Sequence, residues 1–405
     1  MQMYRSAAIL TNKHPMRERE GIPHHVMDHV GWNEEYFLHR FKAEALAAIA
    51  DIHGRGKLPI LVGGTHYYLQ SILFNNKTIV TSNTSEAKIS GEEQAILDGD
   101  PEQLITHLRK YDPEVSEKFH PNDTRRIRRA LEIYFTTKKK ASEFYGEQKK
   151  SDTEESPLRF NTMVFWLYSE KSVLDARLDT RVDKMMEMGA IEELKELYSA
   201  YTSFQEPPDL EKGVWQMIGF KEFLPWLESD EPETEKKVLL DQCISKMKQA
   251  TRKYAKSQVK WIRNLLAPEM NMEQAHGFCK GGKIFLLDAT DLHKFEENVM
   301  ERGEGITKEF LEKVNVEKYH QTPGGMESLL PLSKYTDSKE KNWKHYVCEV
   351  CTDPKTEKPL VFVGSQYDIH MASNRHKNTV KRLQRRKENE KWILRKKQDT
   401  GATKS

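Results

Sequence analysis

The chain has 405 residues and a mass of 47.3 kDa, which predicts two or three domains at about 100–200 residues each. Hydrophobic residues make up 37% and charged residues 31%, which indicates a buried core under a polar surface and excludes a wholly disordered chain. No long apolar run and no apolar signal region occur, so the sequence predicts neither a membrane-spanning helix nor secretion. Four cysteines in a chain of this length favour a reducing compartment over a disulfide scaffold.

The net charge of +2 conceals an uneven distribution of charge along the chain. Residues 341–405 contain 16 Lys and Arg against 7 Asp and Glu, whereas the rest of the chain contains 48 against 55. The basic end predicts an anionic partner, and a solvated charged tail is the alternative.

The first clear element is a helix over residues 41–53, where apolar residues recur at helical spacing. It leads into the apolar run 57–62, a predicted buried strand that ends in Gly63-Gly64-Thr65. Glycines after a strand let backbone amides approach a phosphate, with the Thr65 hydroxyl as a further donor. A simple turn is the alternative.

Two further strands are predicted at 162–168 and 283–287, and helical patterns lie between the strands. This alternation predicts an α/β fold with a parallel sheet. The charged stretch 75–156 is predicted to be a helical insertion, and 172–268 is predicted to be helical with a break at Pro207-Pro208. The expected organisation is a core in two parts (1–74 and 157–311), an insertion (75–156), a linker (312–340) and a zinc-binding end (341–405).

The strongest local motif is Cys348-x2-Cys351 followed by His370-x5-His376. Two thiolates and two imidazoles complete a tetrahedral zinc shell, and a site made only of protein ligands is structural. The stretch that follows, 377–397, is predicted to be a basic helix. Zinc beside a basic helix indicates contact with a nucleic-acid backbone.

Two more basic clusters point to an anionic partner, with solvated helix faces as the alternative. The first is Arg125, Arg126, Arg128 and Arg129, which follow Asp123, a candidate N-cap. The second lies in 246–263, where one helix face is expected to carry four cations while three apolar side chains pack inward. The cations are Arg252, Lys256, Lys260 and Arg263, and the inward side chains are Tyr254, Val259 and Ile262.

Arg177 and Arg181 lie one helical turn apart, with Asp179 and Asp183 between and beyond them. A salt-bridged helix face and an anion site both account for this spacing.

Six blocks in this order resemble the tRNA dimethylallyltransferases, also called tRNA isopentenyltransferases. The blocks are GIPHH, LVGGTHYYLQ, HPND-x-RRIRRALEIY, RLDTRVDKMMEMGAIEEL, GVWQMIGFKEFLPWL and ATRKYAKSQVKWIRN. The Cys-His end is similar to the zinc finger of eukaryotic, especially fungal, members, and the resemblance covers nearly the whole chain.

The resemblance implies a P-loop-kinase-like α/β core with a helical insertion. It implies transfer of the five-carbon group of dimethylallyl diphosphate, assisted by Mg2+, to N6 of adenine 37 beside the tRNA anticodon. The target base is then expected to leave the anticodon loop and enter a channel. A monomer in the cytoplasm, with mitochondrial and nuclear pools, is expected.

The resemblance implies that Thr65 lies at the reaction centre, and Arg181 is expected to hold the oxygens of the departing diphosphate. Other matching positions are expected to bind the tRNA anticodon stem-loop, and the zinc finger is expected to clamp the stem. These positions are Gln2, Arg125, Arg126, Arg128, Arg129, Gln216, Gly219, Lys221, Lys256, Gln258, Lys260 and Arg263.

The family pattern starts upstream of the segment that matches Met1–Tyr4, with a strand, a Gly-rich loop ending in Gly-Lys-Ser/Thr, and an Asp-Ser pair. That Asp is the family's general base. By themselves, these 405 residues are therefore expected to fold poorly and to be inactive. A catalytically silent tRNA-binding protein is the alternative function, and a nucleotide kinase of similar core is a weaker one.

Overall fold

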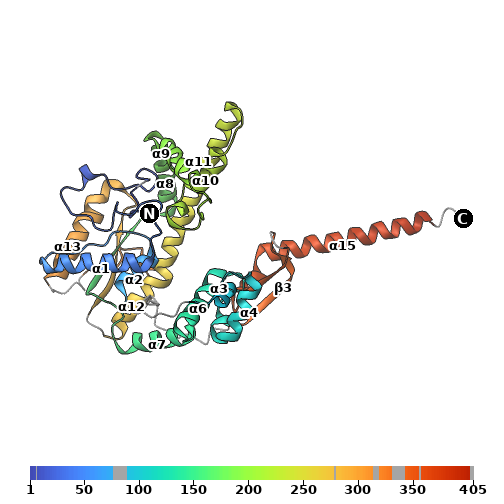
Figure 1. The fold of residues 1–405 in the computed structure, drawn as a ribbon, viewed down its shortest axis with the longest axis horizontal. Coiled ribbons are helices and arrows are strands. Elements are labelled where there is room, and N and C mark those ends of the chain that lie inside the picture. Colours follow the sequence, from blue (N-terminus) through green and yellow to red (C-terminus); the bar gives the residue numbers. More distant parts are fainter. Residues whose placement is uncertain are drawn as a thin grey trace. The chain divides into compact units, whose positions relative to one another are not determined.

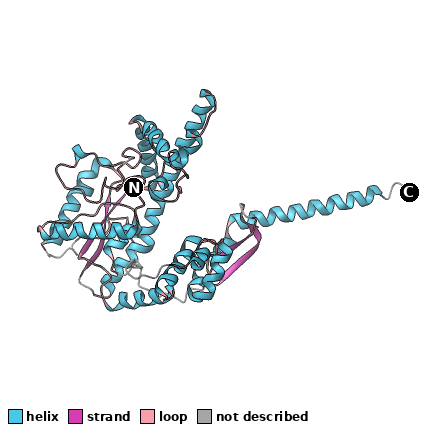
Figure 2. Cartoon of the chain, viewed as in Figure 1, coloured by secondary structure: helices cyan, strands magenta, loops and turns pink. Residues whose placement is uncertain are grey.

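The computed structural model describes residues 1–5, 7–75, 89–277, 280–312, 319–330, 343–354 and 357–401. The chain divides into two compact units, Met1–Thr78 with Asp152–Tyr335 and Ile79–Ser151 with Thr336–Ser405. Figures 1 and 2 show that helices predominate in both units and that the strands are short. No helix in the described part of the chain is long and apolar enough to cross a membrane.

Among the described residues of the first unit, strands β1 and β2 lie within a set of helices (Figure 1). In chain order its elements are α1 (Leu38–Gly54), α2 (His66–Leu73), β1 (Thr162–Tyr168), α8 (Lys171–Glu187), α9 (Ala190–Thr202), α10 (Phe220–Leu227), α11 (Glu233–Trp261), α12 (Ala267–Ala275), β2 (Gly281–Asp288) and α13 (Arg302–Leu311). Single π-helical turns follow α11 and precede α13, at Ile262–Leu266 and Glu296–Glu301.

The two strands pair in parallel, in register from Met163 opposite Lys283 to Tyr168 opposite Asp288. A parallel pair needs a long crossover, and helices α8 to α12 provide it. Strands at 162–168 and 283–287 are thus confirmed, as is the helix predicted over 41–53. The fold is mostly helical with a small parallel sheet.

The strand predicted at 57–62 is wrong for this structure, because the segment is neither paired nor buried. Ile60 is 78% exposed and Val62 is 93% exposed. Strand backbone groups must pair with a neighbouring strand, and no described segment pairs with this one. An apolar run therefore predicts a strand only where a partner strand lies beside it.

The main apolar core of the first unit joins the N-terminal residues to helices α8 to α11. Phe220 and Phe223 of α10 are fully buried there, beside Leu194 and Leu197 of α9. A second cluster covers the sheet and includes Phe74 and Leu286. Burial of such side chains is worth about 1.5–3 kcal/mol each, so these clusters hold α8 and α11 in fixed positions.

The second unit combines two distant parts of the chain. Its elements are α3 (Gly91–Leu97), α4 (Pro101–Tyr111), α5 (Pro113–Lys118), α6 (Thr124–Thr137), α7 (Ala141–Glu154), β3 (His345–Thr352), β4 (Pro359–Val363), α14 (Gln366–Ala372) and α15 (Asn374–Gly401). The segment 377–397 lies in α15, as the basic-helix prediction requires.

Contacts within this unit connect its two parts. His120 Nε2 lies 2.8 Å from the carbonyl oxygen of Val361 in β4, and Lys358 forms an ion pair with Glu102. The helices α3 to α7 agree with the helical prediction for that stretch, while the predicted domain boundaries stay a prediction. Much of the linker predicted at 312–340 lies outside the described residues.

Candidate functional site

Thr65 lies at the N-terminal end of α2, where the chain turns from an extended segment into the helix. Its side chain is exposed, and its carbonyl oxygen accepts hydrogen bonds from the N–H groups of Tyr68 and Leu69. The carbonyl of the preceding Gly64 accepts a hydrogen bond of 2.9 Å from Gln258 Nε2. The Thr65 hydroxyl lies 3.5 Å from that of Tyr254. The Thr65 side chain is therefore held from α11 yet open to solvent.

His66 follows Thr65 and stacks on the indole of Trp261, with ring centroids 4.0 Å apart and ring planes 6° from parallel. Burial lowers the pKa of His66 to about 4, so its imidazole is neutral at physiological pH. It therefore contributes stacking rather than charge to this turn.

Arg177 and Arg181 of α8 have different partners. Arg177 donates to the carbonyl oxygens of Ala289 and Thr290, at 2.7 and 2.6 Å, just beyond the end of β2. Those bonds attach α8 to the sheet. Arg181 has no hydrogen-bond or ion-pair partner among the described residues, and partial desolvation lowers the pKa of its guanidinium.

The acids beside Arg181 are already neutralised by α11. Asp179 forms an ion pair with Arg252, and Asp183 forms one of 2.6 Å with Lys248. The salt-bridged face that the spacing of Arg177 and Arg181 allowed is therefore not formed in the described structure, because both acids pair with α11 instead. Arg181 stays available for an anion from outside the chain.

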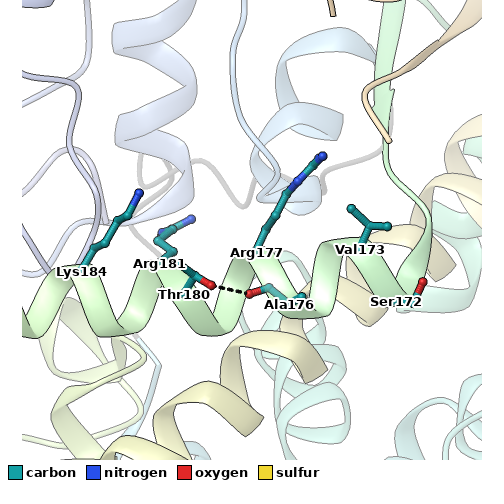
Figure 3. Close-up of a pocket in the computed structure, with 7 residues that line it drawn as sticks. All are labelled: Ser172, Val173, Ala176, Arg177, Thr180, Arg181 and Lys184. Carbon is teal, nitrogen blue, oxygen red and sulfur yellow. Dashed lines mark hydrogen bonds between the residues drawn. The ribbon is translucent and has the colours of Figure 1, made fainter. Parts of the chain in front are cut away.

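Arg181 lines an open pocket of about 710 Å³ along α8. Figure 3 shows the side chains of Arg177, Arg181 and Lys184 rising from one face of the helix. The remaining lining residues are Ser172, Val173, Ala176 and Thr180. A pocket with cations on one wall suits a compact anion such as a diphosphate.

The four arginines predicted to contact tRNA on α6 are all exposed. Three of them pair with acids of the same unit: Arg126 with Asp123, Arg128 with Asp98 and Glu132, and Arg129 with Glu132. Arg125 has no such partner among the described residues. Asp123 caps the helix by accepting from the backbone N–H of Arg126, as predicted.

Four other predicted tRNA-binding residues lie in the first unit. Gln2 donates to the carbonyl of Thr11, Gln216 donates to that of Gly213, and Lys221 pairs with Glu211. Gly219 is buried, with a φ of 113° that favours glycine, and begins α10. Its contribution to any tRNA contact is therefore through the backbone turn that it permits.

Two of the four cations predicted on the basic face of α11 form contacts within the protein. Lys256 and Lys260 are exposed, whereas Arg252 pairs with Asp179 and Arg263 donates to the carbonyl of Ser328. Val259 and Ile262 pack inward as predicted. The inward prediction for Tyr254 is wrong: this side chain is 42% exposed and faces Thr65.

Cys348, Cys351, His370 and His376 come together as the spacing predicts. All four are buried, and their ligand atoms lie within 4.8 Å of one another. The two cysteines lie in β3, His370 in α14, and His376 in the first turn of α15, with a helix break at Ser373 between the histidines. His370 Nε2 is buried without a hydrogen-bond partner in the described chain, as a ligand atom facing a metal would be. The donor set and its closeness fit Zn2+.

The contacts from Tyr254 and Trp261 to the Thr65 turn were not expected from the sequence. The spacing of Tyr254, Gln258 and Trp261 places them on one helix face, which is a visible signal. Nothing in the sequence identifies Gly64–His66 as the segment opposite that face.

Comparisons of sequence and structure with known proteins identify the family of this chain. Residues 2–265 match the family model described as IPP transferase. The chain is 46% identical over 401 residues to a tRNA dimethylallyltransferase of Saccharomyces cerevisiae, covering 98% of this chain and 88% of the relative. It is 36% identical to one of Schizosaccharomyces pombe, covering 96% and 89%, and 30% identical to one of Homo sapiens, covering 95% and 80%.

A solved structure of a eukaryotic dimethylallyltransferase acting on tRNA is also similar, with a TM-score of 0.81 and 46% identity. The match covers 97% of this chain and 91% of that one. The chain described here therefore belongs to the tRNA dimethylallyltransferase family, of the eukaryotic type with a C-terminal Cys2His2 cluster.

Proposed function

We propose that the protein transfers the dimethylallyl group of dimethylallyl diphosphate to N6 of adenine 37 in tRNA. The observation that carries this proposal is Arg181, a partly desolvated guanidinium whose neighbouring acids are occupied by α11. A cation prepared in this way stabilises the negative charge that develops on a departing diphosphate.

In the reaction, the adenine N6 lone pair forms a bond to C1 of the allylic substrate. The C1–O bond breaks, and diphosphate leaves with the electron pair. Thr65 lies at the N-terminal end of α2, where the helix dipole favours negative charge, so its hydroxyl is suited to donate to a diphosphate oxygen. By resemblance, the N6 proton passes to an Asp that the family carries upstream of the segment matching Met1–Tyr4, within a P-loop-kinase-like core.

The described acids near Arg181 do not fit a magnesium site. Mg2+ is usually held by one or two carboxylates together with phosphate oxygens, and both Asp179 and Asp183 are ion-paired here. Mg2+ therefore remains an expectation from the resemblance, and no step is assigned to it.

We further propose that Cys348, Cys351, His370 and His376 hold a structural Zn2+. The metal would fix β3, β4 and α14, and thereby the start of the basic helix α15. The exposed cations of α15 would then be held in place to bind phosphates of the anticodon stem-loop. Exposed cations of α6 and α11 are proposed to bind further phosphates of the tRNA.

The test is product formation by the protein expressed with whatever sequence its gene encodes upstream of Met1, in parallel with the 405 residues described here. Each is incubated with tRNA and labelled dimethylallyl diphosphate, and digested nucleosides are analysed by mass spectrometry. We expect N6-dimethylallyladenosine from the protein expressed with the upstream sequence and none from the 405 residues by themselves. A tRNA in which adenine 37 is replaced by guanine should give no product with either protein. Tight tRNA binding without product from either protein would instead support the silent tRNA-binding protein.

A further inference from the structure

One ridge of α11 contacts the turn that carries Thr65. Tyr254, Gln258 and Trp261 are spaced i, i+4 and i+7, so they lie on the same helix face. Gln258 donates to the Gly64 carbonyl, the Tyr254 hydroxyl lies 3.5 Å from that of Thr65, and Trp261 stacks on His66. Three successive residues of the turn thus each have a partner on α11.

The approach of Gln258 to the turn requires glycine at position 64. A Cβ at Gly64 would lie 2.0 Å from Gln258 Nε2, whereas a Cβ at Gly63 would have no atom within 4 Å. Neither glycine has a φ in the left-handed region, so space alone separates the two positions. Position 64 is therefore shaped for contact with the Gln258 amide.

The same helix is tied to the Arg181 helix. Arg252 and Lys248, within ten residues of Gln258, form ion pairs with Asp179 and Asp183 on either side of Arg181. Helix α11 therefore connects the Thr65 turn to the helix that carries the unpaired cation, as the arrangement of α2, α8 and α11 within one unit allows (Figure 1).

We infer that Gln258 is a positioning residue for Thr65, and that this role replaces the direct tRNA contact expected from the sequence. Its amide fixes the Gly64 carbonyl, and this fixes the direction in which the Thr65 hydroxyl points at the start of α2. This inference rests on the proposed transferase function, in which Thr65 contacts the reacting groups.

The first experiment compares the steady-state kinetics of Gln258→Ala and Gln242→Ala in the protein expressed from its full gene. Gln242 is an exposed glutamine on the same helix, about four turns away, and is a matched control. We expect Gln258→Ala to lower kcat on the order of 10- to 100-fold, because a small displacement of a reacting group is costly, while the KM for tRNA stays unchanged. A raised KM for tRNA with an unchanged kcat would show a tRNA contact and overturn the inference.

A second experiment tests whether Gln258 acts through Thr65. In a double-mutant cycle, Thr65→Ala should make Gln258→Ala silent, because the group being positioned is gone. Gly64→Ala should displace the Gln258 side chain and give the same loss of kcat as Gln258→Ala. Combining the two should cause no further loss, whereas additive losses in either pair would contradict a shared role.

A third measurement does not depend on activity. The N–H groups of Tyr68 and Leu69 bond to the Thr65 carbonyl, so amide hydrogen exchange in 65–73 reports how firmly the turn is held. We expect faster exchange there in Gln258→Ala and parent-like exchange in Gln242→Ala. Unchanged exchange in Gln258→Ala would overturn the inference even in an active protein, and faster exchange would uphold the positioning contact even if no product formed.

Discussion

Two arginines one turn apart on α8 differ in what their guanidinium groups contact. Arg177 satisfies two carbonyl oxygens beyond β2, whereas Arg181 has no partner in the described structure and remains next to an open pocket. The difference arises because α11 supplies Arg252 and Lys248 to the neighbouring acids. Two residues of the same type in a regular pattern thus differ: Arg177 has a structural role, and Arg181 has the binding role only in the function proposed above.

This difference predicts that alanine at position 177 lowers stability, whereas alanine at position 181 lowers product formation. Arg177→Ala should lower the free energy of unfolding by about 2 kcal/mol, because two carbonyl oxygens lose their donor. Arg181→Ala should leave it unchanged or slightly raised, because an unpaired, partly desolvated charge is removed. Product formation should fall by about 100-fold or more in Arg181→Ala. Urea unfolding and initial rates measure both effects, and a loss of stability in Arg181→Ala would indicate a structural role.

His66 predicts a pH dependence of stability. Its folded-state pKa of about 4 lies below the ordinary histidine value of 6.5, so between these pH values the unfolded chain binds the additional proton. The free energy of unfolding should therefore fall as the pH drops from about 6.5 toward 4, and this contribution should be constant above that range. His66→Gln should make the dependence shallower in urea titrations from pH 7.5 to 4.5. An unchanged slope would mean that His66 has the same pKa in the folded and unfolded states, which would contradict the effect of its burial.

At the scale of single elements, the environment of a helix decides how much of its charge is available. Helix α6 buries Ile127, Leu131 and Ile133 and exposes its arginines, as an amphipathic pattern predicts. Three of those arginines are nevertheless held by acids, and only Arg125 among the four lacks a described partner. Cations that are already paired contribute less to phosphate binding, because the internal pair must first be broken.

Arg125 and Arg128 form a matched pair for testing this point. The affinity K of tRNA binding falls as salt rises, so the slope of log K against log salt is negative. Arg125→Ala should make this slope less steep by about 0.7–0.9, the value expected for the loss of one phosphate contact. Arg128→Ala should change the slope less, because Arg128 is shared between Asp98 and Glu132. Filter-binding titrations at several salt concentrations give the slopes. Equal changes would show that the internal ion pairs open without cost when tRNA binds.

At the scale of the whole molecule, parts of the chain that have separate apolar cores are expected to unfold separately. The core of helices α3 to α7 contains only residues between 89 and 144 among those described, and none from the Cys2His2 segment. The finger instead rests on a two-stranded hairpin, which is marginal in water without further support. Metal binding is therefore expected to supply much of its folding free energy.

Removal of zinc should accordingly unfold only the finger. A chelator should increase amide exchange in β3, β4 and α14 while leaving α4 and α6 protected. Elemental analysis should find one zinc per chain in the parent and none in Cys351→Ser. Cys243→Ser is the control, because Cys243 is buried in the core of the first unit and should not affect the metal content. Loss of protection in α4 and α6 on chelation would show that the second unit folds as one cooperative body.

Local properties of the residues were sufficient to predict much of this protein. Helical periodicity, the apolar runs 162–168 and 283–287, the Asp123 cap and the Cys2His2 spacing each depend on interactions between residues near in sequence or on the fixed geometry of a metal shell. The strand prediction for 57–62 was wrong because a strand needs a neighbouring strand to pair with, and the residue pattern alone does not supply one.

The sequence by itself thus determined most of the helices, two strands, the Cys2His2 cluster and the family resemblance. Only the tertiary structure decided which charged side chains form ion pairs within the protein and which have no partner in the described chain. The pairing of Asp179 and Asp183 with α11 and the bond from Gln258 to Gly64 all join residues at least 65 positions apart, and the first of these leaves Arg181 unpaired among the described residues. Such contacts depend on how helices pack, and packing is a property of the assembled core rather than of any local pattern.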